Sequence, residues 1–414
     1  MGKFKPRRMY KPNLTDEGVH VNTLLKLLDG HNPLDLQLVE KLNLDKLENE
    51  FIAIRGAATL VKAQEDINKQ FHKEDYISTL DNISIDTQDD KLKLKFENIE
   101  GSAFFETLEL ADIVAIPKYS TKSDFFSDLF GMDKYAKELL NNGCADILQA
   151  NVSLLKSKNI AQKERKYRLL YDNKENKFYI RAIVSKDLYK DYDNNITIVV
   201  GLIALHRQMQ EQGIEYSINR IEYNESYIRV YFEEQNTREL ENIGYVKNLI
   251  IASNDEIKRE SLKFDAGCSI IYTSTEGVDQ ELFIQPSLSG KSKIESNITS
   301  VRHTSSVDNF IESIIKIDES TQVHDELYQL ITDISNLNNL QELKFIIRSK
   351  VRYAKNKSFK KYKEDITRVI DEFNVGNIIQ LLTLFNKMDL ITENDIEANE
   401  YVRYLVYECL INKK

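Results

Sequence analysis

The chain has little glycine and proline, 14 and 5 residues among 414. Loops that cradle phosphates are commonly built with glycine, and both residues mark turns and element ends. Their scarcity predicts long regular elements with few such loops. No glycine-rich nucleotide motif, paired metal-ligand spacing or nucleophile triad stands out. We therefore expect no catalytic residue, no metal site and no cofactor.

Cysteine is also scarce, and Cys144, Cys268 and Cys409 lie far apart in the sequence. An odd number without paired spacing speaks against disulfides and favours a reducing compartment. No apolar run approaches the ~20 residues that span a bilayer, and the charged first nine residues have no apolar stretch behind them. We expect a cytoplasmic protein without a signal peptide or a membrane span.

Apolar residues make up 42% of the chain, which is enough to form a sizeable core. Its length predicts two or three domains, and its patterns predict an α+β fold. We expect a mixed α/β N-terminal region with a basic arm over residues 1–155 and an antiparallel β-rich core with one helix over 160–300. An all-helical C-terminal domain would follow over 307–414.

In the N-terminal region, residues 21–28, 36–47 and 123–142 show helical spacing. Residues 91–97 alternate with period two, as a half-buried strand does, and the apolar stretch 104–116 would pair with them in a hairpin.

In the central region only residues 196–212 read as a helix, which Gly213 would end. Residues 287–306 are rich in Ser, Lys, Asn and Thr and predict a loop or a domain boundary. The expected strands would form an antiparallel sheet packed against the helix; they are residues 166–171, 177–185, 214–222, 227–233, 246–252, 262–273 and 281–285.

In the C-terminal domain an apolar stripe over residues 340–370 predicts one long amphipathic helix with cations on both sides of the stripe. Residues 374–376 would end it before two shorter helices at 378–386 and 395–410.

Charge is unevenly distributed. Residues 1–12 carry +5 and residues 341–369 carry +7, which leaves −22 for the rest of a chain whose net charge is −10. Two basic surfaces on an acidic body could bind a polyanion locally.

The basic helix is the strongest candidate for nucleic-acid binding, because its cations could contact phosphates and its aromatic rings could stack on bases. Alternatively, the cations simply face water on the outside of the helix while the aromatic rings belong to the core, or the cations contact an acidic partner or this protein's own acidic body. The basic arm at residues 1–12 offers a second set of cations with aromatic rings among them. The candidate residues are Lys344, Arg348, Lys350, Arg352, Tyr353, Lys355, Lys357, Lys360 and Lys361 on the helix and Lys5, Arg7 and Arg8 on the arm.

Three further arginines fall on expected strands. Arg181 would share one open sheet face with Arg168 and Arg229, and such a face would suit a nucleic-acid backbone. The alternative is that they pair across strands with acids, namely Glu222, Glu233 or Glu234.

A metal-dependent nuclease remains a third possibility, because Asp255, Glu256 and Lys258 follow an apolar strand as magnesium-holding residues of restriction-type nucleases do. Cys268 reads as a small core residue, and His206 reads as a residue at the boundary of its helix.

Several segments resemble a known family. Residues 168–172, 181–189 and 192–194, then 249–255 and the Arg-His-Thr of 301–306, are similar in type and order to the motifs of an uncharacterised phage/plasmid-like protein family of mobile elements. The resemblance spans 166–317, although Gly267-Cys-Ser-Ile270 stands where the family has Cys-x-Asn. It implies a cytoplasmic, phage-encoded or mobile-element protein in the company of recombination genes, and it transfers no catalytic residue.

Together these features favour a non-enzymatic nucleic-acid-binding protein of a phage or mobile element, acting on single-stranded DNA in replication or recombination. The alternative from another class is a protein-interaction factor that modifies host transcription or defence. Either could be an oligomer.

Overall fold

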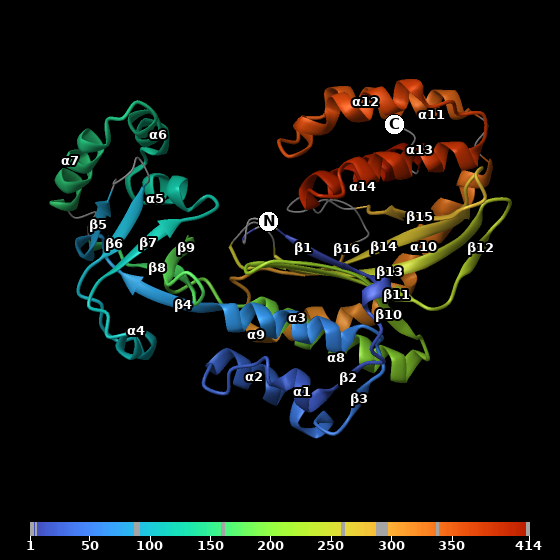
Figure 1. Cartoon of the computed structure of the whole chain (residues 1–414). Helices are drawn as coiled ribbons and strands as arrows, with labels where there is room; N and C mark the ends of the chain where they lie inside the picture. Colours follow the sequence, from blue (N-terminus) through green and yellow to red (C-terminus); the bar gives the residue numbers. More distant parts are fainter. Residues whose placement is uncertain are drawn as a thin grey trace. The chain divides into compact units, whose positions relative to one another are not determined.

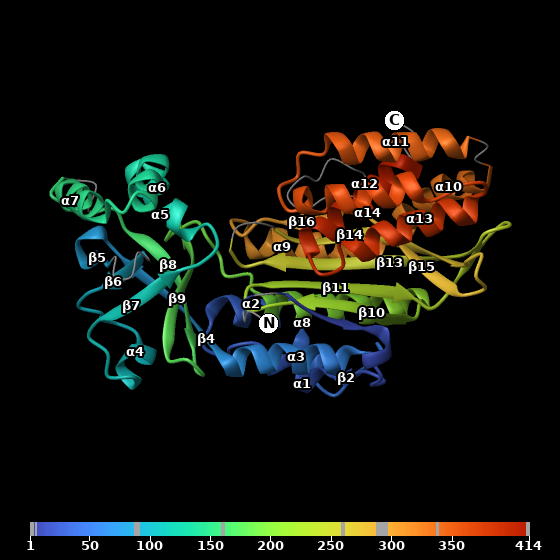
Figure 2. The same ribbon diagram turned by 45° about the horizontal axis from the view of Figure 1, so that its top comes forward.

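The structure is a computed structural model, and it describes residues 4, 6–86, 92–158, 162–257, 261–286, 297–336 and 339–410. The chain forms two compact units. The larger comprises Met1–Ala63 and Asp191–Lys414, and the smaller comprises Gln64–Lys190. Each unit has its own sheet with packed helices (Figures 1 and 2), which confirms the predicted α+β fold.

The larger unit is built on an antiparallel sheet with strand order β1-β10-β11-β13-β14-β15, to which β12 adds beside β13 and β16 beside β14. A separate pair, β2 and β3, lies outside it. The strands are β1 (Arg7–Tyr10), β10 (Tyr216–Tyr223), β11 (Tyr227–Glu234), β12 (Arg238–Leu240), β13 (Gly244–Asp255), β14 (Leu262–Thr273), β15 (Asp279–Ile284), β16 (Asn297–Val301), β2 (Val19–His20) and β3 (Phe51–Ile52).

The two faces of this sheet differ in character. One is apolar and packs on α8 (Asn194–Gln212), where the Phe264 ring lies against Gly201 of the helix. The other is charged and lies under α13 (Ile378–Ile391) and α14 (Ile396–Leu410), as Figure 1 shows. The alternation of side chains along each strand separates the two faces.

Helix α8 confirms the predicted helix at 196–212 and begins two residues earlier. The Asp193 carboxylate accepts a hydrogen bond from the Ile196 N–H at 2.9 Å, which caps the first turn. Gly213, with φ of 68°, ends it in the left-handed conformation. The helix is buried on most sides because its apolar run is nearly continuous.

The C-terminal part is helical, as predicted, and none of the described helices is long and apolar enough to span a membrane. Of the predicted loop at 287–306, residues 287–296 lie outside the described residues. Residues 297–301 form the strand β16, which pairs with β14 through Val301 and Leu262. The remaining helices of the unit are α1 (Val21–Leu25), α2 (Pro33–Lys41), α3 (Ala57–Gln70), which continues into the smaller unit, α9 (Val307–Ile315), α10 (Ser320–Thr332), α11 (Leu340–Tyr353) and α12 (Lys363–Glu372).

The smaller unit has a mixed sheet with strand order β4-β8-β9-β7-β6-β5, in which only β7 and β9 run parallel among the described pairings. Its strands are β4 (Phe71–Ser78), β5 (Ile83–Asp86), β6 (Lys93–Phe96), β7 (Ile113–Pro117), β8 (Arg165–Asp172) and β9 (Lys177–Val184), and its helices are α4 (Ala103–Thr107), α5 (Thr121–Phe130), α6 (Asp133–Asn141) and α7 (Ala145–Lys156).

The strands β8 and β9 therefore pair with strands from the N-terminal region, whereas the sequence predicts them in one sheet with residues 214–285. Because β9 is buried on both faces, its sequence is apolar along most of its length. Such a strand takes two neighbours, and these are β8 and β7.

Two predicted elements of this unit are divided. The stretch 104–116 begins with α4, which Ser102 caps by accepting from the Phe105 N–H at 3.3 Å, and only β7 pairs with β6. The helix predicted at 123–142 is two helices, because Gly131 adopts a φ of 63° and ends α5.

Asp35, in the first turn of α2, is only 6% exposed. Its Oδ2 accepts a hydrogen bond from the Asp29 N–H at 2.7 Å. Burial raises its pKa to about 6, and the charges of Asp29 and Asp191 add to the effect. Because this pKa lies above the ordinary value of 3.8, stability is lost as pH rises from about 4 to about 6, and the full cost of ionising Asp35 is present above that range.

We expect Asp35→Asn to stabilise the fold by about 1–3 kcal/mol at pH 8, since the amide keeps the acceptor and removes the charge. The gain should nearly vanish at pH 4. Urea denaturation of both proteins at the two pH values measures it, and a gain independent of pH would show that the Asp35 charge is not its cause.

Candidate nucleic-acid interface

The predicted basic arm is an edge strand. Residues Arg7–Tyr10 form β1 and pair with β10, and the Arg8 Nε lies 2.9 Å from the Glu222 Oε1. Lys11 follows with its Nζ 2.7 Å from the Glu233 Oε1. Arg7 is exposed on β1, and Lys5 lies outside the described residues. The segment thus completes a sheet, and Arg8 and Lys11 would have to leave their carboxylates to bind a phosphate.

The predicted open face with Arg168, Arg181 and Arg229 is wrong. All three are at most 3% exposed, and Arg229 lies in the larger unit's sheet whereas the other two lie in the smaller unit's. Their strands are interior strands, covered on both sides. The alternative, in which these arginines pair with acids, is right in kind, although these two acids are not the ones predicted. The Arg168 Nε lies 3.1 Å from the Asp75 Oδ1, and the Arg229 Nη1 lies 3.3 Å from the Glu400 Oε2.

The basic amphipathic helix predicted at 340–370 is two helices, α11 and α12, with a short 3-10 turn over Phe359–Tyr362 between them. Ala354 leaves the helical conformation with ψ of 130°. The Asn356 side chain then accepts from the Phe359 N–H at 3.0 Å, and the Phe359 ring is fully buried. The predicted apolar stripe is nevertheless confirmed, because it is buried; Leu343, Ile347, Val351, Ala354, Ile366 and Ile370 lie in the core, and Leu340 and Tyr362 pack against it partly buried.

Four of the predicted cations are held by neighbouring helices. The Lys344 Nζ donates to the Phe373 carbonyl at 2.7 Å, at the end of α12. The other three pair with carboxylates and would have to leave them to bind a phosphate: Arg348 with Asp371 at 2.5 Å, Lys350 with Glu408 at 3.6 Å and Lys361 with Asp395 at 2.8 Å.

The remaining predicted residues gather in residues 352–363, which we call the basic turn. The turn contains six cations and no acid. Within the part of the chain that the structure describes, four of these cations are exposed and have no carboxylate at ion-pair distance, and Tyr353 among them is 69% exposed. The four cations are Arg352, Lys355, Lys357 and Lys360.

The backbone of the basic turn is fixed from within the domain. The Lys363 Nζ donates to the Arg352 carbonyl at 3.1 Å and closes the turn. The Ser358 hydroxyl donates to Glu397 of α14. With the Asn356 cap and the buried Phe359 ring, these contacts fix the backbone from which the exposed cations project, so binding has to order their side chains but not the turn.

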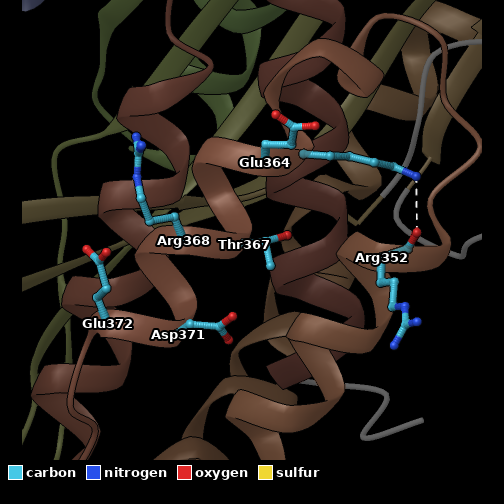
Figure 3. Close-up of a pocket in the computed structure, with 7 residues that line it drawn as sticks. Arg352, Glu364, Thr367, Arg368, Asp371 and Glu372 are labelled. Atoms are coloured by element: carbon cyan, nitrogen blue, oxygen red, sulfur yellow. Dashed lines mark hydrogen bonds between the residues drawn. The ribbon is translucent and has the colours of Figure 1, made fainter.

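A groove of about 610 Å³ runs along α12 beside the turn (Figure 3). Its charges balance, since it is lined by three cations, three acids and a threonine. Arg368 in addition pairs with Asp365 at 2.8 Å. A polyanion would therefore gain more from the turn than from the groove. The lining residues are Arg352, Lys363, Glu364, Thr367, Arg368, Asp371 and Glu372.

A buried layer of charge, which no sequence pattern indicates, joins the sheet to α13 and α14. The Arg403 Nε and Nη2 donate to the two oxygens of Asp389 at 2.7 and 3.1 Å, and its Nη1 donates to the Tyr231 hydroxyl at 3.2 Å. Burial works to lower the pKa of Arg403, but the Asp389 carboxylate raises it above its ordinary value. The Arg220 guanidinium stacks nearby on the Phe283 ring, 4.5 Å from its centroid. This layer anchors α13 and α14 to the sheet, and α11 and α12, which carry the basic turn, pack on these two helices.

The residues of the nuclease alternative have structural contacts. The Glu256 Oε1 accepts from the Asn194 N–H at 3.0 Å, where the positive end of α8 favours a carboxylate. The Asp255 Oδ1 accepts from the Ile257 N–H at 2.9 Å, and Lys258 lies outside the described residues. No group of three or more potential ligands that could hold a metal ion occurs among the residues searched, which are those the structure describes.

The other chemically reactive side chains also have ordinary surroundings. Cys268 is buried, and burial raises the pKa of its thiol, which disfavours the nucleophilic thiolate. The His206 Nε2 lies 2.7 Å from the Glu50 Oε2 at the border of α8.

No protein-family model matches the chain, and neither a curated protein nor a solved structure shows significant similarity to it.

Proposed function

We propose that this protein binds nucleic acid without acting on it chemically, and that its basic turn contacts the phosphate backbone. The observation that carries the proposal is the group of four exposed cations, Arg352, Lys355, Lys357 and Lys360, to which the described residues offer no carboxylate. Exposed ammonium and guanidinium groups without a carboxylate partner can exchange water and counterions for phosphate oxygens, and the released counterions favour binding.

The charge of the rest of the chain supports a local contact. Outside the two basic segments the chain carries −22, so a nucleic acid would be repelled from most of the surface and directed to the turn. The arm adds little to the attraction, because Arg8 and Lys11 already face Glu222 and Glu233.

The sequence resemblance supplies a context for this proposal. A cytoplasmic protein of a phage or mobile element that binds nucleic acid would serve replication or recombination of that element. Its partner in this context is the element's own nucleic acid rather than a host protein.

We expect a fluorescent 20-nucleotide oligonucleotide to bind the full-length protein at ~50 mM salt, with affinity falling roughly 50-fold at ~200 mM if four phosphates are contacted. Fluorescence anisotropy titrations at the two salt concentrations measure this. The absence of binding at the lower concentration to single-stranded or duplex oligonucleotide alike would refute the proposed function.

A further inference from the structure

We infer that the basic turn takes an unpaired strand rather than a duplex, and that a base of this strand stacks on the ring of Tyr353. The inference rests on the proposed function and goes further by naming the form of the nucleic acid and the residue that selects it.

Tyr353 is placed for this contact. It is the last residue of α11, and its side chain is 69% exposed although the adjacent Val351 and Ala354 are buried in the domain core. The guanidinium carbon of Arg352 lies 5.7 Å from the centroid of the ring. The structure thus joins an open aromatic surface to a cation that has no carboxylate partner among the described residues, and such a pair can hold a base and its phosphate together.

The exposure of the ring is built into the turn. Tyr353 stands between the end of α11 and a backbone that Lys363 fixes by donating to the Arg352 carbonyl at 3.1 Å. Because both sides of the residue are held, the ring keeps its outward position without a ligand. A preformed platform of this kind binds a base at a low entropic cost.

The distribution of charge favours one strand over two. The four exposed cations of the basic turn fall within nine residues of chain, from Arg352 to Lys360, and so form a short strip. Arg352 also lines the groove along α12, where Asp371 and Glu372 stand at the end of that helix (Figure 3). A single strand can follow the strip. A duplex also presents the phosphates of its second strand, some of which would face these acids, and its stacked bases offer no open face to Tyr353.

A second ring extends the surface. Phe345, also 69% exposed, lies eight residues before Tyr353 on α11, which corresponds to about 12 Å along the helix axis. Eight residues also turn the helix by about 80° beyond two full turns, so a strand that stacks one base on Tyr353 would have to bend around α11 to place another on Phe345.

The test compares a 20-nucleotide oligothymidine with a 20-base-pair duplex in binding to the full-length protein and two variants at position 353. Tyr353→Phe keeps the aromatic ring, and Tyr353→Leu removes it while keeping an apolar side chain. Tyr245→Leu is the matched control, because Tyr245 is 52% exposed on β13 of the same unit. Both positions are exposed enough for the three variants to fold, which circular dichroism checks.

We expect Tyr353→Leu to weaken binding of oligothymidine ~5- to 100-fold while Tyr353→Phe and Tyr245→Leu leave it unchanged. Binding of the duplex should be weaker than that of oligothymidine and insensitive to Tyr353→Leu. Equal binding of the two nucleic acids, unchanged by Tyr353→Leu, would overturn this inference and leave the proposed function standing.

Two other outcomes bear on the proposed function itself. Failure to bind either nucleic acid would overturn both. If poly-L-glutamate of matched charge displaces oligothymidine as well as unlabelled oligothymidine does, the turn serves an acidic protein surface, and the stacking site is refuted with it.

Discussion

Arg403→Ala is expected to destabilise the protein by about 3–5 kcal/mol, because it removes one partner of a buried ion pair. The Arg403 side chain is 1% exposed, and Asp389 accepts two of its hydrogen bonds. Without the guanidinium, the Asp389 carboxylate stays largely buried, and among the described residues only the Asn399 amide still donates to it, at 2.9 Å. Urea denaturation followed by circular dichroism measures the loss.

Two comparisons test whether the loss of stability in Arg403→Ala comes from the broken buried ion pair. Arg368→Ala, which breaks the exposed pair with Asp365, should cost at most about 1 kcal/mol. Adding Asp389→Leu to Arg403→Met should restore much of the stability lost in Arg403→Met alone, since no buried charge is then left unpaired. A cost of Arg403→Ala no greater than that of Arg368→Ala would contradict the buried anchor of α13 and α14.

The second large effect is expected on binding. Replacing Lys355, Lys357 and Lys360 together by alanine should weaken oligonucleotide binding ~100-fold or more at ~50 mM salt, because three phosphate contacts are lost with their released counterions. Stability should hardly change, since the three side chains are exposed and none has a carboxylate partner among the described residues. Fluorescence anisotropy and urea denaturation measure the two effects.

A matched control variant separates the loss of the binding site from the loss of net positive charge. The triple variant Lys134→Ala, Lys137→Ala and Lys158→Ala also removes three exposed lysines, from α6 and from the residues that follow α7. It should bind nearly as the unmutated protein does. Equal weakening by both triple variants would mean that binding follows total charge and that the basic turn is not the site.

Elements set by local sequence were predictable from sequence. Helix α8 could be predicted because its cap at Asp193, its apolar run and its stop at Gly213 lie in one segment. The neighbours of β9 could not, because its pairing with β7 joins Ala115 to Phe178, far apart in the chain. An alternating or apolar pattern identifies a strand but not its partner.

The site was predictable to a similar extent. The cations of residues 341–369 were visible as a cluster, and the buried stripe between them was correctly placed. Which cations stay available depends on acids of other helices, such as Asp371, Asp395 and Glu408, and the sequence could not place these. The burial of Arg168, Arg181 and Arg229 was missed for the same reason, since a charged residue on a strand looks exposed until its partners are known.

The salt dependence of binding tests the central claim most directly. The logarithm of the association constant, plotted against the logarithm of salt concentration, should have a slope about 2 units shallower for the Lys355, Lys357 and Lys360 triple variant than for the unmutated protein, since each lost phosphate contact on a single strand removes about 0.7. The matched control variant should keep the unmutated slope. Equal slopes for all three proteins would contradict the proposal that the basic turn contacts the phosphate backbone.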